Sequence, residues 1–79
     1  MRPVILVYSE IDTQYALLKH QSAVLFQNEK AAIDFMGQMY DSLNEDLNYL
    51  THGSYGDNNA ELNSPRTHER FYWKIITTL

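Results

Sequence analysis

The sequence predicts an α+β fold in which a small antiparallel sheet packs on one long amphipathic helix. Between residues 29 and 50, apolar side chains recur every three or four positions, which is the period of one helical face. Residues 3–8 and 71–78, on either side of this segment, are rich in β-branched and aromatic residues, as is typical of strands. The chain has 79 residues, 44% of them hydrophobic, and no cysteine. We therefore expect one domain, residues 1–79, without a disulfide or a thiolate metal site.

The N-terminal part is expected to form a strand followed by a hairpin. Residues 3–8 are apolar on both alternating faces, which is typical of a strand covered on both sides or buried in a dimer. In the hairpin interpretation, residues 13–19 and 23–27 are strands joined by a turn at residues 20–22. In the alternative, Ser9 begins a short helix through a capping box and the order is βαβαβ. We favour the hairpin, because about ten residues are few for a crossover helix. The predicted order is then ββ(β)αβ, with about four strands.

The central helix, residues 29–50, is expected to begin after Asn28, which is a good N-cap residue. Gly53 follows where a left-handed residue often closes a helix. At 1.5 Å per residue, about 22 residues make a rod roughly 33 Å long, which can span the whole domain. The predicted apolar face consists of Ala32, Met36, Met39, Leu43, Leu47 and Leu50.

The segment after the helix, residues 51–69, is rich in Gly, Asn, Ser and Pro and is expected to form one long loop. Loops of this length in compact domains tend to be functional or disordered. The chain then closes with the strand at residues 71–78. A sheet of about four strands with one helix leaves its second face open. We therefore expect that face to be covered by another protein or by a second copy of the chain in a homodimer.

Charge and motifs argue against several classes of function. The net charge of −4 has the wrong sign for a general binder of nucleic acid or of an anionic membrane. No apolar run is long enough for a membrane span and no signal peptide is evident, so we expect a cytoplasmic protein. The chain has no phosphate-binding loop, nucleophile elbow or zinc motif. We therefore expect no enzyme activity, no cofactor and no metal.

The candidate binding residues are tyrosines and arginines, which combine contact area with directed hydrogen bonds and are enriched at interfaces. They gather in the expected loop and the last strand, where we predict a partner-binding surface formed by Tyr55, Arg66, Arg70 and Tyr72. The competing surface is the acidic arc on the outer face of the helix, formed by Asp34, Asp41 and Glu45. Carboxylates on such a face are normally solvated.

The leading hypothesis is a non-catalytic protein-interaction module, an inhibitor or regulator that occupies a surface of a larger protein. In size and acidity the chain is similar in type to small proteins that phages and mobile elements encode against host machinery, although no motif carries this likeness. The alternative is a nucleic-acid-associated regulator that uses the basic segment Arg66–Lys74. The third hypothesis is a small enzyme in which His52 or His68 acts as general base.

Overall fold

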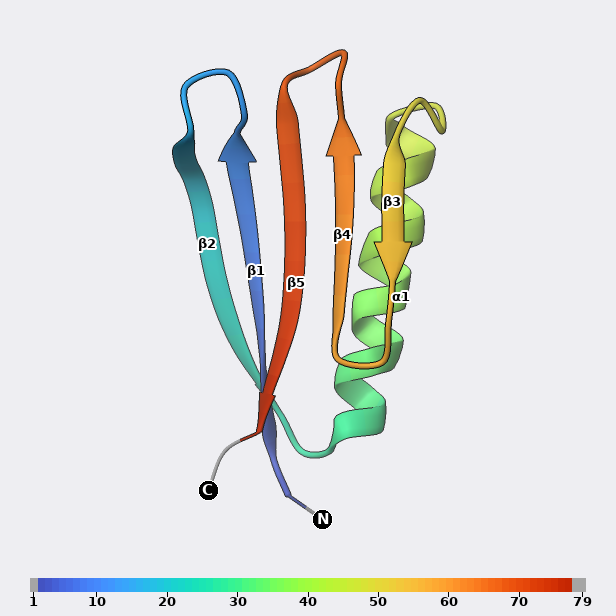
Figure 1. Ribbon diagram of the computed structural model, residues 1–79. Coiled ribbons are helices and arrows are strands. Elements are labelled where there is room, and N and C mark those ends of the chain that lie inside the picture. Colours follow the sequence, from blue (N-terminus) through green and yellow to red (C-terminus); the bar gives the residue numbers. More distant parts are fainter. Residues whose placement is uncertain (1, 78–79) are drawn as a thin grey trace.

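The computed structural model describes residues 2–77, which form one antiparallel sheet with a single helix on one face (Figure 1). The elements follow in the order β1 (Val4–Asp12), β2 (Leu17–Phe26), α1 (Glu29–Asp46), β3 (His52–Tyr55), β4 (Asn59–Ser64) and β5 (Glu69–Thr77). The strand order in the sheet is β2-β1-β5-β4-β3, so α1 connects the two edge strands. The predicted α+β class is confirmed. The sheet has five strands rather than about four, and the chain order is ββαβββ rather than ββ(β)αβ or βαβαβ.

The N-terminal part forms strands rather than the alternative helix, but the hairpin predicted within residues 13–27 is wrong. β1 and β2 pair along their whole lengths, and the predicted turn at residues 20–22 lies inside β2. The actual turn follows Asp12, whose Oδ1 accepts hydrogen bonds from the backbone N–H groups of Gln14 (2.9 Å) and Tyr15 (3.3 Å). An aspartate that bonds the backbone in this way forms a stable turn by itself. One strand therefore replaces the two that were predicted.

The helix begins as predicted and ends about one turn earlier. The side chain of Asn28 accepts a hydrogen bond from the backbone N–H of Ala31 at 2.9 Å, which is the expected N-cap contact. The last helical residue is Asp46. Asn48 and Tyr49 then adopt left-handed conformations, with φ of 56° and 58°. Asparagine tolerates this region better than most residues, so Asn48 takes the role that was predicted for Gly53, five residues farther along.

Residues 51–69, predicted as a long loop, instead contain β3 and β4. The two strands pair from His52 opposite Asn63 to Tyr55 opposite Ala60. Gly56 closes the turn between them by donating its N–H to the carbonyl of Asn59 at 2.8 Å. The sequence did not indicate these strands because the segment is rich in polar, turn-forming residues and β4 has only two apolar side chains. Gly53, predicted as the helix cap, lies within β3.

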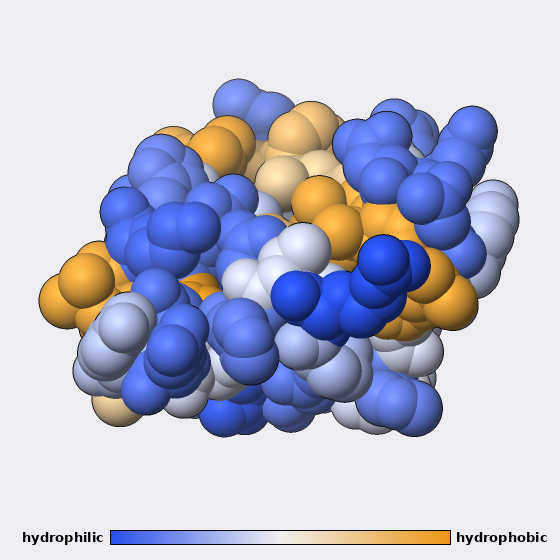
Figure 2. All heavy atoms as spheres, turned by 90° about the horizontal axis from the view of Figure 1, so that it is seen from above, coloured by the Kyte–Doolittle hydropathy of each residue, from blue (hydrophilic) through white to orange (hydrophobic). Residues whose placement is uncertain are grey.

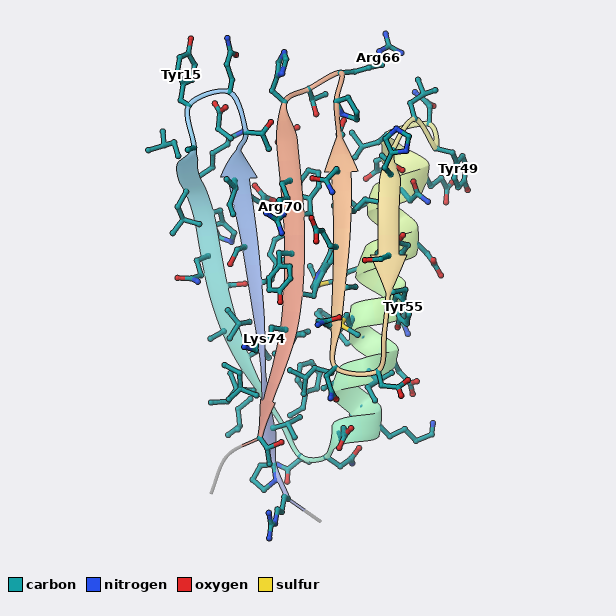
Figure 3. The ribbon with its side chains drawn as sticks, viewed as in Figure 1. Tyr15, Tyr49, Tyr55, Arg66, Arg70 and Lys74 are labelled. Atoms are coloured by element: carbon teal, nitrogen blue, oxygen red, sulfur yellow. The ribbon has the colours of Figure 1, made fainter. Side chains whose placement is uncertain are left out.

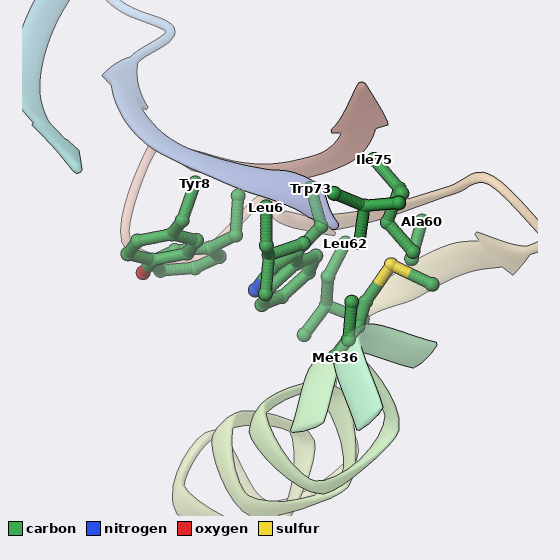
Figure 4. Close-up of a cluster of buried hydrophobic side chains, with 10 residues drawn as sticks. Leu6, Tyr8, Met36, Ala60, Leu62, Trp73 and Ile75 are labelled. Carbon is green, nitrogen blue, oxygen red and sulfur yellow. The ribbon is translucent and has the colours of Figure 1, made fainter. Parts of the chain in front are cut away.

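The core lies between α1 and the sheet face that it covers (Figure 4). Its largest fully buried side chains are Trp73, Leu6, Met36, Leu62 and Val4. The predicted helix face is largely confirmed, because Ala32 and Met36 are buried and Met39, Leu43 and Leu47 pack against the core. Leu50 lies beyond the helix and is exposed.

One helix cannot cover the whole face of this sheet. Five strands spaced about 4.8 Å apart make a sheet roughly 20 Å wide, whereas a helix with its side chains is about 10 Å wide. Figure 1 shows α1 behind β4 and β3, which leaves much of β2 uncovered on the helix side. The opposite sheet face carries no element from residues 2–77. Within this range, no helix is long and apolar enough to cross a membrane.

Candidate interaction surface

The predicted binding surface does not form one cluster, because Tyr55, Arg66 and Arg70 lie apart (Figure 3). Arg70 and Tyr72 lie together on the face of the sheet opposite the helix, with the guanidinium 5.9 Å from the centre of the tyrosine ring. Arg70 Nε also lies 2.7 Å from Glu61 Oε1, so its charge is paired. Tyr55 lies on the helix side of β3, and Arg66 lies in the turn between β4 and β5. Of the four, the structure brings together only Arg70 and Tyr72, and their binding role stays a prediction.

The competing acidic arc is an exposed surface of α1. Asp34, Asp41 and Glu45 are all exposed. Asp34 Oδ2 lies 3.2 Å from Lys30 Nζ, a pair that is exposed on both sides and contributes little to stability. A binding role for the arc also stays a prediction. In the part of the chain that the structure describes, no three histidine, aspartate or glutamate side chains are grouped in a way that could hold a metal ion.

The edge strand β2 is exposed along most of its length. Its ten residues include Leu17, Leu18, Val24 and Leu25, which are 44% to 65% exposed. Seen from above, hydrophobic side chains reach the surface at the left, on the side where β2 lies (Figure 2). Natural edge strands are usually short or guarded by charges, proline or bulges. β2 has one bulge, near Lys19, and residues 21–26 carry no charge and no proline.

The backbone of β2 offers unpaired hydrogen-bonding groups along this edge. The N–H of Thr13 donates to the carbonyl of His68 at 2.9 Å, which marks a hydrogen-bonded pair between the ends of β1 and β5. Because hydrogen-bonded pairs alternate along an antiparallel ladder, the even-numbered residues of β1 bond to β2. Their partners include Ser22 and Val24. The backbone groups that point away from the sheet are those of Gln21, Ala23 and Leu25.

The opposite edge, β3, is exposed but much shorter. It has only four residues, which is itself a guard against strand pairing. The ring of Tyr55 lies 5.4 Å from that of Tyr40 in an edge-to-face contact, and its hydroxyl donates to the carbonyl of Ile33 at 3.4 Å. Tyr55 therefore joins this edge to α1, and β2 is the longer edge for a partner strand, with ten residues against four.

A groove of about 320 Å³ runs along the side of α1 that faces the uncovered part of the sheet. Phe35, which is 40% exposed, stands near one end and contacts Phe26, with 5.4 Å between ring centres. Asp46, the last residue of α1, lies at the other end of the groove. The groove is lined by Tyr8, Phe35, Gln38, Met39, Ser42, Leu43, Asp46 and Trp73. Its walls are therefore mainly apolar, with a few polar groups, as is typical of binding sites.

The two aromatic rings from the sheet provide this groove with polar groups. Tyr8 and Trp73 lie 5.2 Å apart between ring centres. The Tyr8 hydroxyl donates to Glu10 Oε1 at 2.6 Å. Burial, and then this hydrogen bond, raise the pKa of Tyr8 well above its usual range. The indole N–H of Trp73 is buried and has no hydrogen-bond partner among residues 2–77. A buried donor without an acceptor is uncommon in folded proteins.

Sequence reasoning missed both the groove and the β2 edge. One signal was present, because Phe35 is a large apolar residue next to Met36 and outside the apolar stripe of the helix. A second was the apolar run Ala23–Phe26, which places hydrophobic side chains on both faces of its strand. Comparison with known proteins identifies no relative: no family model matches the chain, and no curated protein and no solved structure is significantly similar to it.

Proposed function

We propose that the protein is a non-catalytic interaction module that acts in the cytoplasm as an inhibitor or regulator, by occupying a surface of a larger protein. The groove beside α1 carries this proposal. It combines exposed apolar walls with a buried indole N–H that the described residues leave without an acceptor. Exposed apolar grooves with a few polar groups are characteristic of protein-recognition sites.

The occupant that fits the groove is an amphipathic helix of the partner. On α1 the lining runs from Phe35 to Asp46, which is roughly 16 Å along the helix axis, or about three turns. The sheet is wide enough for two helices side by side and holds one. A partner helix lying parallel to α1 would place apolar residues of the i, i+3, i+4 and i+7 pattern against Phe35 and Met39.

The charge of the chain favours a basic partner. The net charge is −4, and Asp46 lies at the groove while Asp41 and Glu45 are exposed farther around α1. Positive residues on the flanks of the partner helix would complement these carboxylates and speed association. The partner helix is therefore expected to be apolar on one stripe and rich in lysine or arginine beside it.

The two other functional hypotheses have less support. A nucleic-acid regulator would need the basic segment Arg66–Lys74 to form a continuous positive surface. Instead, Arg70 is paired with Glu61, and Arg66 lies in a turn whereas Lys74 lies within β5. For the enzyme hypothesis, His52 lies on β3 and His68 in the β4–β5 turn, and neither forms an ion pair or hydrogen bond with a carboxylate within residues 2–77. These arrangements favour the interaction module.

The test uses two matched substitutions on opposite faces of the sheet. Phe35 and Ile76 are 40% and 44% exposed, so Phe35→Glu and Ile76→Glu make the same change at similar accessibility. A photo-crosslinking residue at Gln38 captures the partner in the native host, and calorimetry then measures its affinity for each variant. Phe35→Glu should weaken binding by about tenfold or more, as expected for a central apolar contact, and Ile76→Glu should leave it nearly unchanged.

The same assay separates the competing surfaces, once circular dichroism shows that each variant is folded. Loss of binding only with Ile76→Glu would refute the groove and move the site to the face that holds Arg70 and Tyr72. Loss only with Tyr55→Ala/Arg66→Ala, or only with Asp41→Ala/Glu45→Ala, would support the surfaces predicted from the sequence instead.

A further inference from the structure

The free edge of β2 has the features of a pairing surface for a second copy of this chain. Residues 21–26 carry no charge, so two chains with a net charge of −4 can approach there without direct repulsion. The backbone groups of Ala23 and Leu25 point outward, and two copies can satisfy them mutually. Antiparallel pairing of identical strands follows a two-fold axis normal to the sheet, so residues that face each other lie on the same side.

We infer that two copies pair through β2 with Val24 opposite Val24 of the second copy. In this register Ala23 lies opposite Leu25 of the second copy, and the two symmetric pairs exchange about four backbone hydrogen bonds. The register also continues an existing row of side chains. Within one copy, Ile5 lies between Leu25 and Ile76 on the face away from α1.

This row supports the Val24 register over its neighbours. Leu25 is 65% exposed and Ile76 is 44% exposed, so the row is an uncovered apolar strip that ends at the β2 edge. Pairing at Val24 extends it onto Ala23 and then Val7 of the second copy, which are also apolar. Shifting the axis to Ala23 would instead place Leu25 opposite Gln21 of the second copy and end the strip at a polar side chain.

The dimer would bring the grooves of the two copies to the same side of one continuous sheet, and each groove would keep the same lining residues. A two-fold axis normal to the sheet keeps both copies of α1 on the same side. The two grooves then face each other across the paired β1 and β2 strands, which form the floor of a single trough. This arrangement rests on the edge strand and not on the groove, so it holds or fails independently of the proposed function.

The absence of cysteine makes the register directly testable. Opposite residues in a non-hydrogen-bonded antiparallel pair have Cα atoms about 4.5 Å apart, which lies within the roughly 4.4–6.8 Å range of disulfides. Val24→Cys should therefore form a covalent dimer readily with oxidised glutathione on a non-reducing gel. Ser54→Cys, on the other edge strand β3, is an exposed control that should crosslink at least tenfold more slowly. Equal rates at the two positions would overturn the register.

Light scattering of the unmodified chain gives the second measurement. At high micromolar concentration the chain should form a dimer, and Leu25→Lys should return it to a monomer because it places a charge at the centre of the interface. Leu25 is exposed and does not line the groove, so this variant should fold and keep its binding to the partner. A wild-type monomer of 9.2 kDa at that concentration would overturn the proposal.

Discussion

Replacing Gly53 with alanine should destabilise the protein, although its backbone does not require glycine. No glycine among the described residues has a positive φ, so conformational freedom is not the reason for its presence. A Cβ at this position would overlap the hydroxyl of Tyr40 and would lie 2.9 Å from both the carbonyl oxygen of Glu61 and Cδ1 of Leu62. The carbonyl is fixed in the sheet and Leu62 is fully buried, so neither group can move away from the added Cβ without a cost in stability. Overpacking of this kind costs about 1–3 kcal/mol.

Gly37 provides a matched control for the same substitution. A Cβ there would meet only the Tyr55 ring, with the hydroxyl oxygen at 2.9 Å. That hydroxyl is the far end of a half-exposed side chain, so it can move. Alanine in a helix interior is favoured over glycine by about 1 kcal/mol. Gly37→Ala should therefore leave the free energy of unfolding unchanged or raise it by up to about 1 kcal/mol.

The assay is urea unfolding followed by the fluorescence of Trp73, the one tryptophan, and by circular dichroism. Gly53→Ala should lower the free energy of unfolding by about 2 kcal/mol. Adding Tyr40→Phe removes the overlapping hydroxyl and should restore part of the loss, which a double-mutant cycle measures. Equal effects of Gly53→Ala and Gly37→Ala, or no recovery in the double variant, would refute the steric explanation.

Two further predictions concern the core and pH. Met36→Ala should lower the free energy of unfolding by about 2–5 kcal/mol because Met36 is fully buried. Asp41→Ala, on the exposed face of α1, should lower it by less than about 0.5 kcal/mol. Equal losses in urea unfolding would mean that the other face of α1 packs on the sheet. The raised pKa of Tyr8 stabilises the fold while the hydroxyl is protonated in both states, and this contribution is lost as pH rises above about 10, the pKa of an unfolded tyrosine. The free energy of unfolding should therefore fall above pH 10 and fall less in Tyr8→Phe, and parallel pH profiles would contradict this role.

Local signals in the sequence predicted the helix well. The Asn28 cap and the spacing of Ala32 and Met36 depend on contacts within one or two turns, and both were found as predicted. Strands were predicted in the N-terminal part, but the hairpin within residues 13–27 was wrong, because the Asp12 side chain stabilises a turn that residue classes alone do not reveal. β3 and β4 were missed because their sequences are mostly polar; they are strands because they pair with each other and β4 pairs with β5.

The groove could not be predicted from the sequence because its residues come from three separate elements. Tyr8, Met39 and Trp73 become neighbours only after β1, α1 and β5 have packed together. The separation of Tyr55 from Arg70 and Tyr72 in the predicted binding surface also depends on how the strands pack. Arg70 and Tyr72 alternate on one strand and so share a face, whereas Tyr55 lies on a strand that the sequence did not reveal.

The indole N–H of Trp73 gives the most direct test of the groove as the binding surface. It produces a single NMR signal, because the chain has one tryptophan, and it lies buried in the groove lining without an acceptor from the described residues. When the crosslinked partner is purified and titrated into labelled protein, this signal should shift and its exchange with solvent should slow. An unchanged indole signal, with shifts confined to the backbone amides of Arg70 and Tyr72, would contradict the account.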